Sequence, residues 1–397
     1  MKKKRFCYLL LTFLAYLNAG RVSALNTFHT EMGDTSMLGA RNFNLEASGR
    51  DSIDFQTQVS IFGLFNPSSA VSVNTGARMI PKLDYLRDFT DDRRMSAQIA
   101  ANVNLNADLG NSYLKFTGSM SLYRAWVRYS TQRNEIRAGL QQINFGSASM
   151  LRPLQWFDGL NPTDPLRLTH GVWGVLDRLY FKNNSTLWLW GLFGNSGKRV
   201  WDANVQNAPM PEFGCRFQHP VPMGELAFSM NHRTVETTLG AASRYRETKI
   251  GLDGKWDVGP GLWFEDSFTA TSKASPLKEG WNSLTVGSDV TPEGLDGLSF
   301  TFEHMLNTTY SNASNSSNLS ALSATWPINL FHRISGIVLY SWESNYWFRY
   351  LTWSADFDRS SFYVIGFWNP NLSSSLLSLG SGSFSKYGLQ LMYVLHL

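Results

Sequence analysis

Cysteine is nearly missing from this sequence. Of the two cysteines in 397 residues, Cys7 lies close to the N-terminus and Cys215 lies in the middle of the chain. Cys7 falls in a segment that we expect to be removed, so the mature chain keeps a single thiol. One thiol cannot form an intrachain disulfide or a cysteine-ligated metal cluster, and both are therefore excluded.

An excess of positive charge is missing as well. The sequence holds 35 Lys and Arg against 31 Asp and Glu, but five of the basic residues precede residue 25, so 30 remain in the mature chain. A chain so close to neutrality gives no support for binding to nucleic acid. The histidines are scattered, with no nucleophile elbow and no metal-type pairing. We therefore expect no enzyme activity, no cofactor and no metal.

The sequence also lacks an apolar run long enough for a membrane-spanning helix, which needs about 20 residues. Its clearest run, from Phe6 to Leu17, is shorter and follows four basic residues. The small residues Val22, Ser23 and Ala24 then offer a cleavage site, so residues 1–24 are predicted to be a signal peptide for export. Any later residence in a membrane must come from strands.

What the sequence has in quantity is alternation of apolar and polar residues. Between Ala97 and Leu109 every second residue is apolar, and Asn, Gln and Asp fill most of the positions between. A period of two is that of a β-strand with two different faces. Similar segments recur from Ile53 to the last residue, while Pro81 to Arg94, charged and rich in turn residues, is interpreted as a connection. A soluble sandwich alternates in the same way, so the period alone leaves the direction of the apolar face open.

The last segment favours the membrane, because its alternate residues are all apolar: Tyr387, Leu389, Leu391, Tyr393, Leu395 and Leu397. A closed barrel needs a lipid-facing final strand that seals against the first, and we assign these six residues as the signal read by the barrel-assembly machinery. Aromatic residues make up 14% of the chain while its mean hydropathy is slightly polar, as in barrels. Residues 25–397 are thus predicted to form an all-β, transmembrane antiparallel β-barrel in outer-membrane lipid, with about 16 strands and a range of about 14 to 18.

One stretch breaks the period. Between Arg137 and Asp164 the sequence carries Arg-x-Gly-x-Gln, then an aromatic residue followed by Gly, then Asp-x-x-Asn-Pro-x-Asp. This pattern resembles porin-like outer-membrane β-barrels of Gram-negative bacteria, among them alginate-export-like and related uncharacterised outer-membrane porins. The resemblance covers mainly residues 128–180 and implies a loop that dips towards the lumen; an ordinary external loop is the alternative. Leu140 stands where a basic residue is common and Phe145 where Trp is common, so no substrate is transferred from the resemblance.

Charged residues on the predicted lumenal faces and in this loop are the candidate pore-lining and constriction residues: Arg124, Arg128, Glu135, Arg137, Arg152, Asp158, Asp164, Arg178 and Lys182. Rings of charged side chains set the selectivity of pores, but structural ion pairs around Glu135 are an equal alternative. A barrel of about 16 strands encloses an aqueous lumen. We therefore expect a passive channel for small hydrophilic solutes, anionic ones among them. The alternative is a non-channel barrel that acts as a rim enzyme or a surface-attachment protein.

Overall fold

The computed structural model describes residues 51–397, apart from positions 68–70, 91, 111–113, 197, 200–204, 238–243, 273–279, 311–314 and 371–383. The predicted signal peptide, residues 1–24, lies outside the described residues. Within the described part of the chain, no helix is long and apolar enough to cross a bilayer.

Nineteen strands account for most of the described residues. They are β1 (Asp51–Phe65), β2 (Val71–Thr90), β3 (Arg93–Gly110), β4 (Leu114–Ser130), β5 (Asn134–Gln141), β6 (Val172–Tyr180), β7 (Thr186–Leu192), β8 (Val205–Asn207), β9 (Glu212–Val221), β10 (Gly224–Thr237), β11 (Arg244–Asp257), β12 (Gly261–Thr271), β13 (Gly280–Val290), β14 (Ser299–Tyr310), β15 (Asn315–Pro327), β16 (His332–Ser341), β17 (Tyr346–Asp356), β18 (Ser360–Trp368) and β19 (Tyr387–His396).

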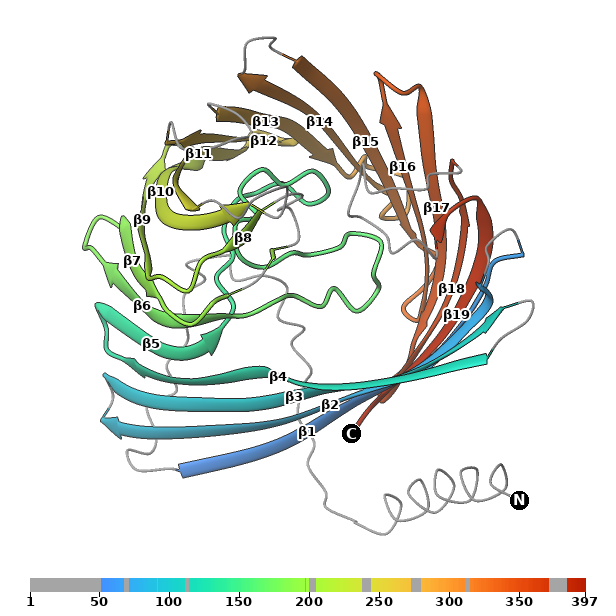
Figure 1. The fold of residues 1–397 in the computed structure, drawn as a ribbon, viewed down its shortest axis with the longest axis horizontal. Coiled ribbons are helices and arrows are strands. Elements are labelled where there is room, and N and C mark those ends of the chain that lie inside the picture. Colours follow the sequence, from blue (N-terminus) through green and yellow to red (C-terminus); the bar gives the residue numbers. More distant parts are fainter. Residues whose placement is uncertain are drawn as a thin grey trace. The chain divides into compact units, whose positions relative to one another are not determined.

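The strands close into one antiparallel barrel (Figure 1). Successive strands pair with each other, and β1 pairs with β19 in a register that runs from Gln58 opposite His396 to Phe65 opposite Leu389. The exception is β8, because β7 pairs with β9, and β8 pairs with the end of β10 beyond β9. The described ring therefore contains 18 strands. The predicted fold class is confirmed, and the strand number lies at the upper end of the predicted range.

One predicted connection is wrong. Residues 81–90 continue β2, and the turn into β3 comes only after Thr90. Pro81 has no N–H to donate, yet it pairs with Thr57 on the β1 side. On the β3 side the register passes from Met79 opposite Val103 to Lys82 opposite Ala100. The missing donor of proline thus lies where pairing with β3 is interrupted, and the strand tolerates it.

The apolar faces of the strands point outward. In β19 the side chains of Leu391 and Tyr393 are each 44% exposed, whereas Met392 and Val394, which alternate with them, are buried. In β3 the side chain of Ile99 is 52% exposed. A soluble sandwich would bury these side chains in its core, while a bilayer-facing barrel presents them to lipid. The predicted direction of the apolar faces is therefore confirmed.

Candidate functional site

The segment between β5 and β6, residues 142–171 and here called the constriction loop, folds into the barrel (Figure 1). Its backbone N–H groups at Ala148 and Leu154 donate to Glu265 of β12, and those from Ser149 to Leu151 donate to Glu303 of β14. Around the 18-strand ring β12 lies six positions from β5, and β14, eight positions away, lies nearly opposite β5. The loop therefore crosses the lumen, as predicted.

Gly146 makes this crossing sterically possible. Its φ of +95° is left-handed, and a Cβ at this position would lie 2.2 Å from Oε1 of Glu265. Glycine tolerates such a φ without a steric penalty. The backbone can therefore pass directly against the Glu265 carboxylate before it reaches Ala148.

An aromatic cluster fixes the root of the constriction loop. The ring of Phe145 packs edge-on against Trp156, with 5.4 Å between centroids, and stacks on Trp190 of β7 at 5.9 Å. The indole Nε1 of Trp156 donates to Ser267 Oγ on β12 over 3.0 Å. Aromatic pairs of this geometry add about 0.5–1.5 kcal/mol each beyond the area they bury. Packing and hydrogen bonds thus position the loop together.

Two predicted constriction residues neutralise each other inside the loop. Nη1 of Arg152 lies 3.2 Å from Oδ2 of Asp158, and both side chains are buried. Arg152 also donates to the side chain of Asn144, and the carbonyl of Asp158 accepts the backbone N–H of His170 over 2.6 Å. Because they are buried, Arg152 and Asp158 brace the loop from within.

The predicted basic residues of β4–β6 do gather around Glu135. Its carboxylate lies 3.2 Å from Arg137, 3.6 Å from Arg178 and 3.7 Å from Arg128. The guanidinium of Arg178 also lies over the ring of Trp188, 3.9 Å from its centroid. The structure therefore brings these four predicted residues together on the lumenal side of β4–β6. It also gives each arginine the acidic partner that the alternative interpretation requires.

Arg124 holds the returning end of the constriction loop. Its guanidinium donates to Thr169 Oγ1 over 2.6 Å, to the Thr169 carbonyl over 3.2 Å and to the Tyr123 carbonyl over 2.7 Å. Burial is the larger cause that lowers the pKa of His170, and the positive charge of Arg124 lowers it further. Arg124 thus belongs to the architecture of the constriction rather than to an open surface.

Asp164 lies in the part of the loop that interacts with β2. Burial raises the pKa of its carboxyl, and the opposing effects include a backbone hydrogen bond from Leu166 and the positive charge of Arg78. Arg78 donates to Asn104 Oδ1 over 2.6 Å and was not among the predicted residues.

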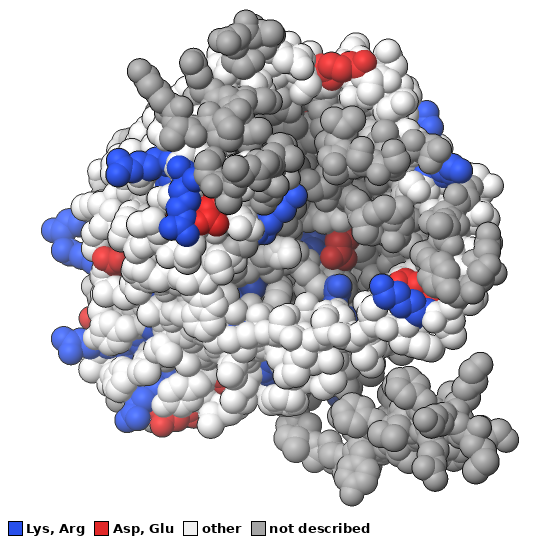
Figure 2. Space-filling model, in the orientation of Figure 1, with Lys and Arg blue, Asp and Glu red and all other residues white. Residues whose placement is uncertain are grey.

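The predicted position of Lys182 is wrong. Lys182 lies exposed in the turn between β6 and β7, and not on a lumenal strand face. Figure 2 shows acidic and basic side chains next to each other around the hollow centre of the visible face.

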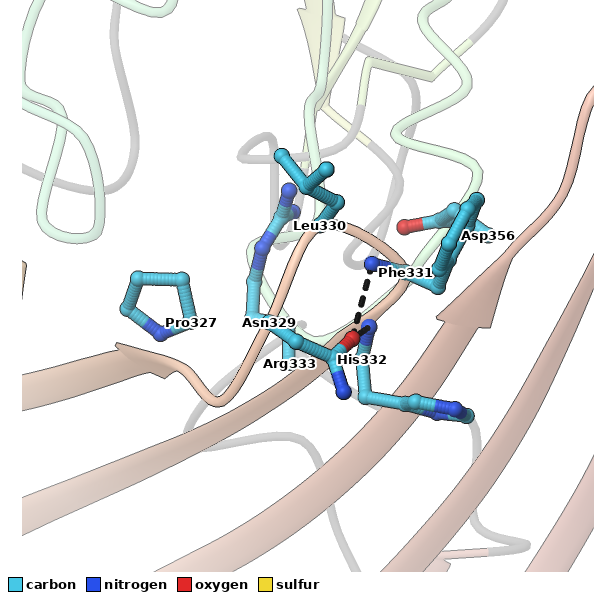
Figure 3. A pocket seen from close by; sticks show the side chains of 7 residues that line it. All are labelled: Pro327, Asn329, Leu330, Phe331, His332, Arg333 and Asp356. Carbon is cyan, nitrogen blue, oxygen red and sulfur yellow. Dashed lines mark hydrogen bonds between the residues drawn. The ribbon is translucent and has the colours of Figure 1, made fainter.

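A cleft of about 560 Å³ lies at the turn between β15 and β16. Its lining residues are Pro327, Asn329, Leu330, Phe331, His332, Arg333 and Asp356 (Figure 3). Within it, Oδ1 of Asn329 accepts the backbone N–H groups of Phe331 over 2.9 Å and of His332 over 2.8 Å. These bonds stabilise the turn itself. Among the described residues, no three His, Cys, Asp or Glu side chains are placed to hold a metal ion.

No protein-family model matches the chain, and no curated protein sequence matches it. Solved structures do match. OccD3 (OpdP) of Pseudomonas aeruginosa superimposes with a TM-score of 0.56 at 9% identity, over 87% of this chain and 91% of its own. OccAB4 of Acinetobacter baumannii gives 0.52 at 8% identity, over 90% and 100%. OccK5 (OpdH) of Pseudomonas aeruginosa gives 0.51 at 9% identity, over 87% and 97%.

At these identities the match concerns the fold. The chain has the fold of porin-like outer-membrane β-barrels, with 18 strands in the described ring and a loop inside it. The resemblance stated from residues 128–180 is confirmed at this level.

Proposed function

We propose that this protein is an outer-membrane channel through which small hydrophilic solutes diffuse passively. The observation that carries the proposal is the combination of an 18-strand ring with one loop that crosses its lumen. A ring of this size exceeds the roughly eight strands whose interior is filled by the strands' own side chains. The constriction loop then narrows the remaining space without needing to seal it.

The lumenal arginines support a preference for anions within this function. Arg128, Arg137 and Arg178 share the carboxylate of Glu135, so three positive charges converge on one negative charge. Cationic side chains in a confined, weakly screened space raise the local concentration of anions. A solute passing between the loop and β4–β6 would meet this group.

The location and assembly of the protein belong to the same proposal. The exposed apolar face of β19 supports its role as the recognition signal for barrel insertion, since Tyr387, Leu389, Leu391, Tyr393 and Leu397 all point outward. Export by a signal peptide at residues 1–24 would bring the chain to that machinery.

Planar-bilayer recording of the refolded mature protein tests the proposal. Discrete conductance steps are expected, with a reversal potential in a salt gradient that indicates preferred passage of anions. If the channel conducts but its reversal potential shows no charge preference, the proposed preference for anions is refuted. A folded barrel that never conducts would overturn the channel itself and favour a rim enzyme or an attachment protein.

A further inference from the structure

We propose that Glu303 and Glu265 are positioning residues that hold the segment Gly146–Leu154, here called the strap, across the lumen and thereby set the width of the channel. The width has a consequence only if the proposed channel function holds. The docking of the strap on the two glutamates can be tested without it.

Glu303 is bonded to the strap through both of its oxygens. Oε1 accepts from the backbone N–H of Ser149 over 2.6 Å and from its Oγ over 3.1 Å. Oε2 accepts from the N–H groups of Met150 over 3.0 Å and Leu151 over 2.6 Å. Three consecutive backbone N–H groups thus donate charge-assisted hydrogen bonds to one carboxylate, and these bonds fix the register of the strap against β14.

The surroundings of Glu303 show that both partners need these hydrogen bonds. Its side chain is 0% exposed, and within the described part of the chain the hydrogen bonds that its carboxylate accepts all come from the strap. The residues beside it on β13 and β15 are Gly287 and Ala321, which carry no charge. A buried carboxylate needs donors, and buried N–H groups need acceptors. Docking of the strap therefore satisfies both sides at once.

Glu265 holds the strap on both sides of the Glu303 contacts. It accepts the N–H of Ala148 over 2.6 Å and that of Leu154 over 3.3 Å, while Gly146 passes directly against its carboxylate. The positive charge of Arg152 in the loop and the negative charge of Asp253 on β11 interact electrostatically with the Glu265 carboxyl group. The two glutamates thus bracket the strap along its whole length.

Beyond the glutamates, the tip of the strap enters an apolar socket on the lumenal wall. Met150 and Leu151 are buried in one cluster with wall residues of β1 and β15–β18, namely Leu64, Leu319, Ala321, Leu339, Phe348, Tyr350 and Phe367. Apolar contact favours the docked strap but is non-directional. The direction and register must come from the hydrogen bonds, which is why we assign the positioning role to the carboxylates.

Glu303→Gln isolates this role, because glutamine keeps the size of the side chain and offers one oxygen instead of two. Whichever way the amide turns, its NH₂ meets at least one backbone N–H donor of the strap, so at least one hydrogen bond is lost and the others lose their charged acceptor. Glu225→Gln is the matched control. Glu225 is a carboxylate of β10 that accepts from Gln218 and has no described bond to the strap.

Two measurements on refolded protein test the proposal. Hydrogen exchange within Ser149, Met150 and Leu151 should become at least about tenfold faster at one or more of the three amides in Glu303→Gln, since a hydrogen bond to a charged group is worth about tenfold or more. Single-channel recording should show a state of higher conductance in the same variant, because the released strap leaves a wider pore. Glu225→Gln should change neither. Met150→Asp, placed on the loop so that the barrel wall is intact, should reproduce both effects even if Glu303→Gln fails to fold.

Unchanged exchange in Glu303→Gln or in Met150→Asp would overturn the docking role. Faster exchange with unchanged conductance would overturn the claim that the strap sets the width. A wild-type barrel that never conducts would refute the proposed function, and the exchange rates would still decide whether the glutamates hold the strap.

Discussion

Arg124→Gln and Arg128→Gln should change different properties of the channel, although both remove an arginine from the lumenal side of β4. Arg124 is bonded to Thr169 at the returning end of the constriction loop. Arg128 bonds Ser96 over 2.9 Å and lies 3.7 Å from Glu135, which also has two other arginine partners. The first variant should change the width of the pore, and the second should change its charge selectivity.

The magnitudes follow from these contacts. Arg124 makes two hydrogen bonds to Thr169, and bonds from a charged group contribute about 1.5–3 kcal/mol each, so the loop end should lose about 3–6 kcal/mol of anchoring. For Arg128, a unit charge about 4 Å from a passing anion contributes about 1 kcal/mol in bulk water, which is about fivefold in local anion concentration. This figure applies to an approach of about 4 Å, and the negative charge of Glu135, 3.7 Å from Arg128, offsets part of it.

Conductance and reversal potential separate the two effects. Arg124→Gln should raise single-channel conductance or its fluctuation, because the loop end is released. Arg128→Gln should shift the reversal potential towards that of a non-selective pore at nearly unchanged conductance. If Arg128→Gln leaves the reversal potential where it was, Arg128 acts only as a partner of Glu135 and the electrostatic reasoning is refuted. If Arg124→Gln leaves conductance unchanged, Thr169 is not a point that the pore width depends on.

Three further outcomes are expected. Gly146→Ala should loosen the loop, because the φ of Gly146 and its contact with Glu265 leave no room for a Cβ. Differential scanning calorimetry should show that the free energy of unfolding falls by about 1–3 kcal/mol. Unchanged stability would contradict the path of the loop across the lumen. Burial raises the pKa of Asp164, so its negative charge should be lost at a higher pH than in an exposed aspartate; anion preference should rise as the pH falls through that range, and Asp164→Asn should abolish the rise. Leu397→Asp should block insertion while export continues, since the cost of the charge against lipid near the interface is at most about 1 kcal/mol; normal accumulation in the outer membrane would contradict the assembly signal.

The fold was predictable because its main signal is local. The outward residues of β19, such as Leu391 and Tyr393, alternate with buried Met392 and Val394, and a period of two can be seen in the sequence without any tertiary information. The strand count was harder, because Pro81 suggested a connection inside what is one continuous strand, β2. Whether a proline ends a strand depends on which neighbour its missing N–H faces, and that is a tertiary property.

The sequence predicted the loop and the basic residues of β4–β6, but not the residues of β12 and β14 that hold the loop. The broken period between Arg137 and Asp164 identified the loop. The basic residues around Glu135 were found because they lie on the same predicted strand faces. The sequence did not predict that Glu265 and Glu303 hold the loop, since their partners are backbone N–H groups more than 100 residues away in sequence. Backbone donors have no sequence signature, and a lone glutamate on a lumenal face looks the same whether it holds a loop or faces water.

Shortening the constriction loop is the most direct test of the central claim that solutes pass beside it. A variant that replaces residues 147–169 by a short turn keeps the 18-strand ring and removes the structure that crosses the lumen. In planar bilayers this variant should show a single-channel conductance clearly above that of the wild type, with a weaker dependence on solute size. Equal conductance in the two proteins would place the loop outside the conducting path and contradict the account.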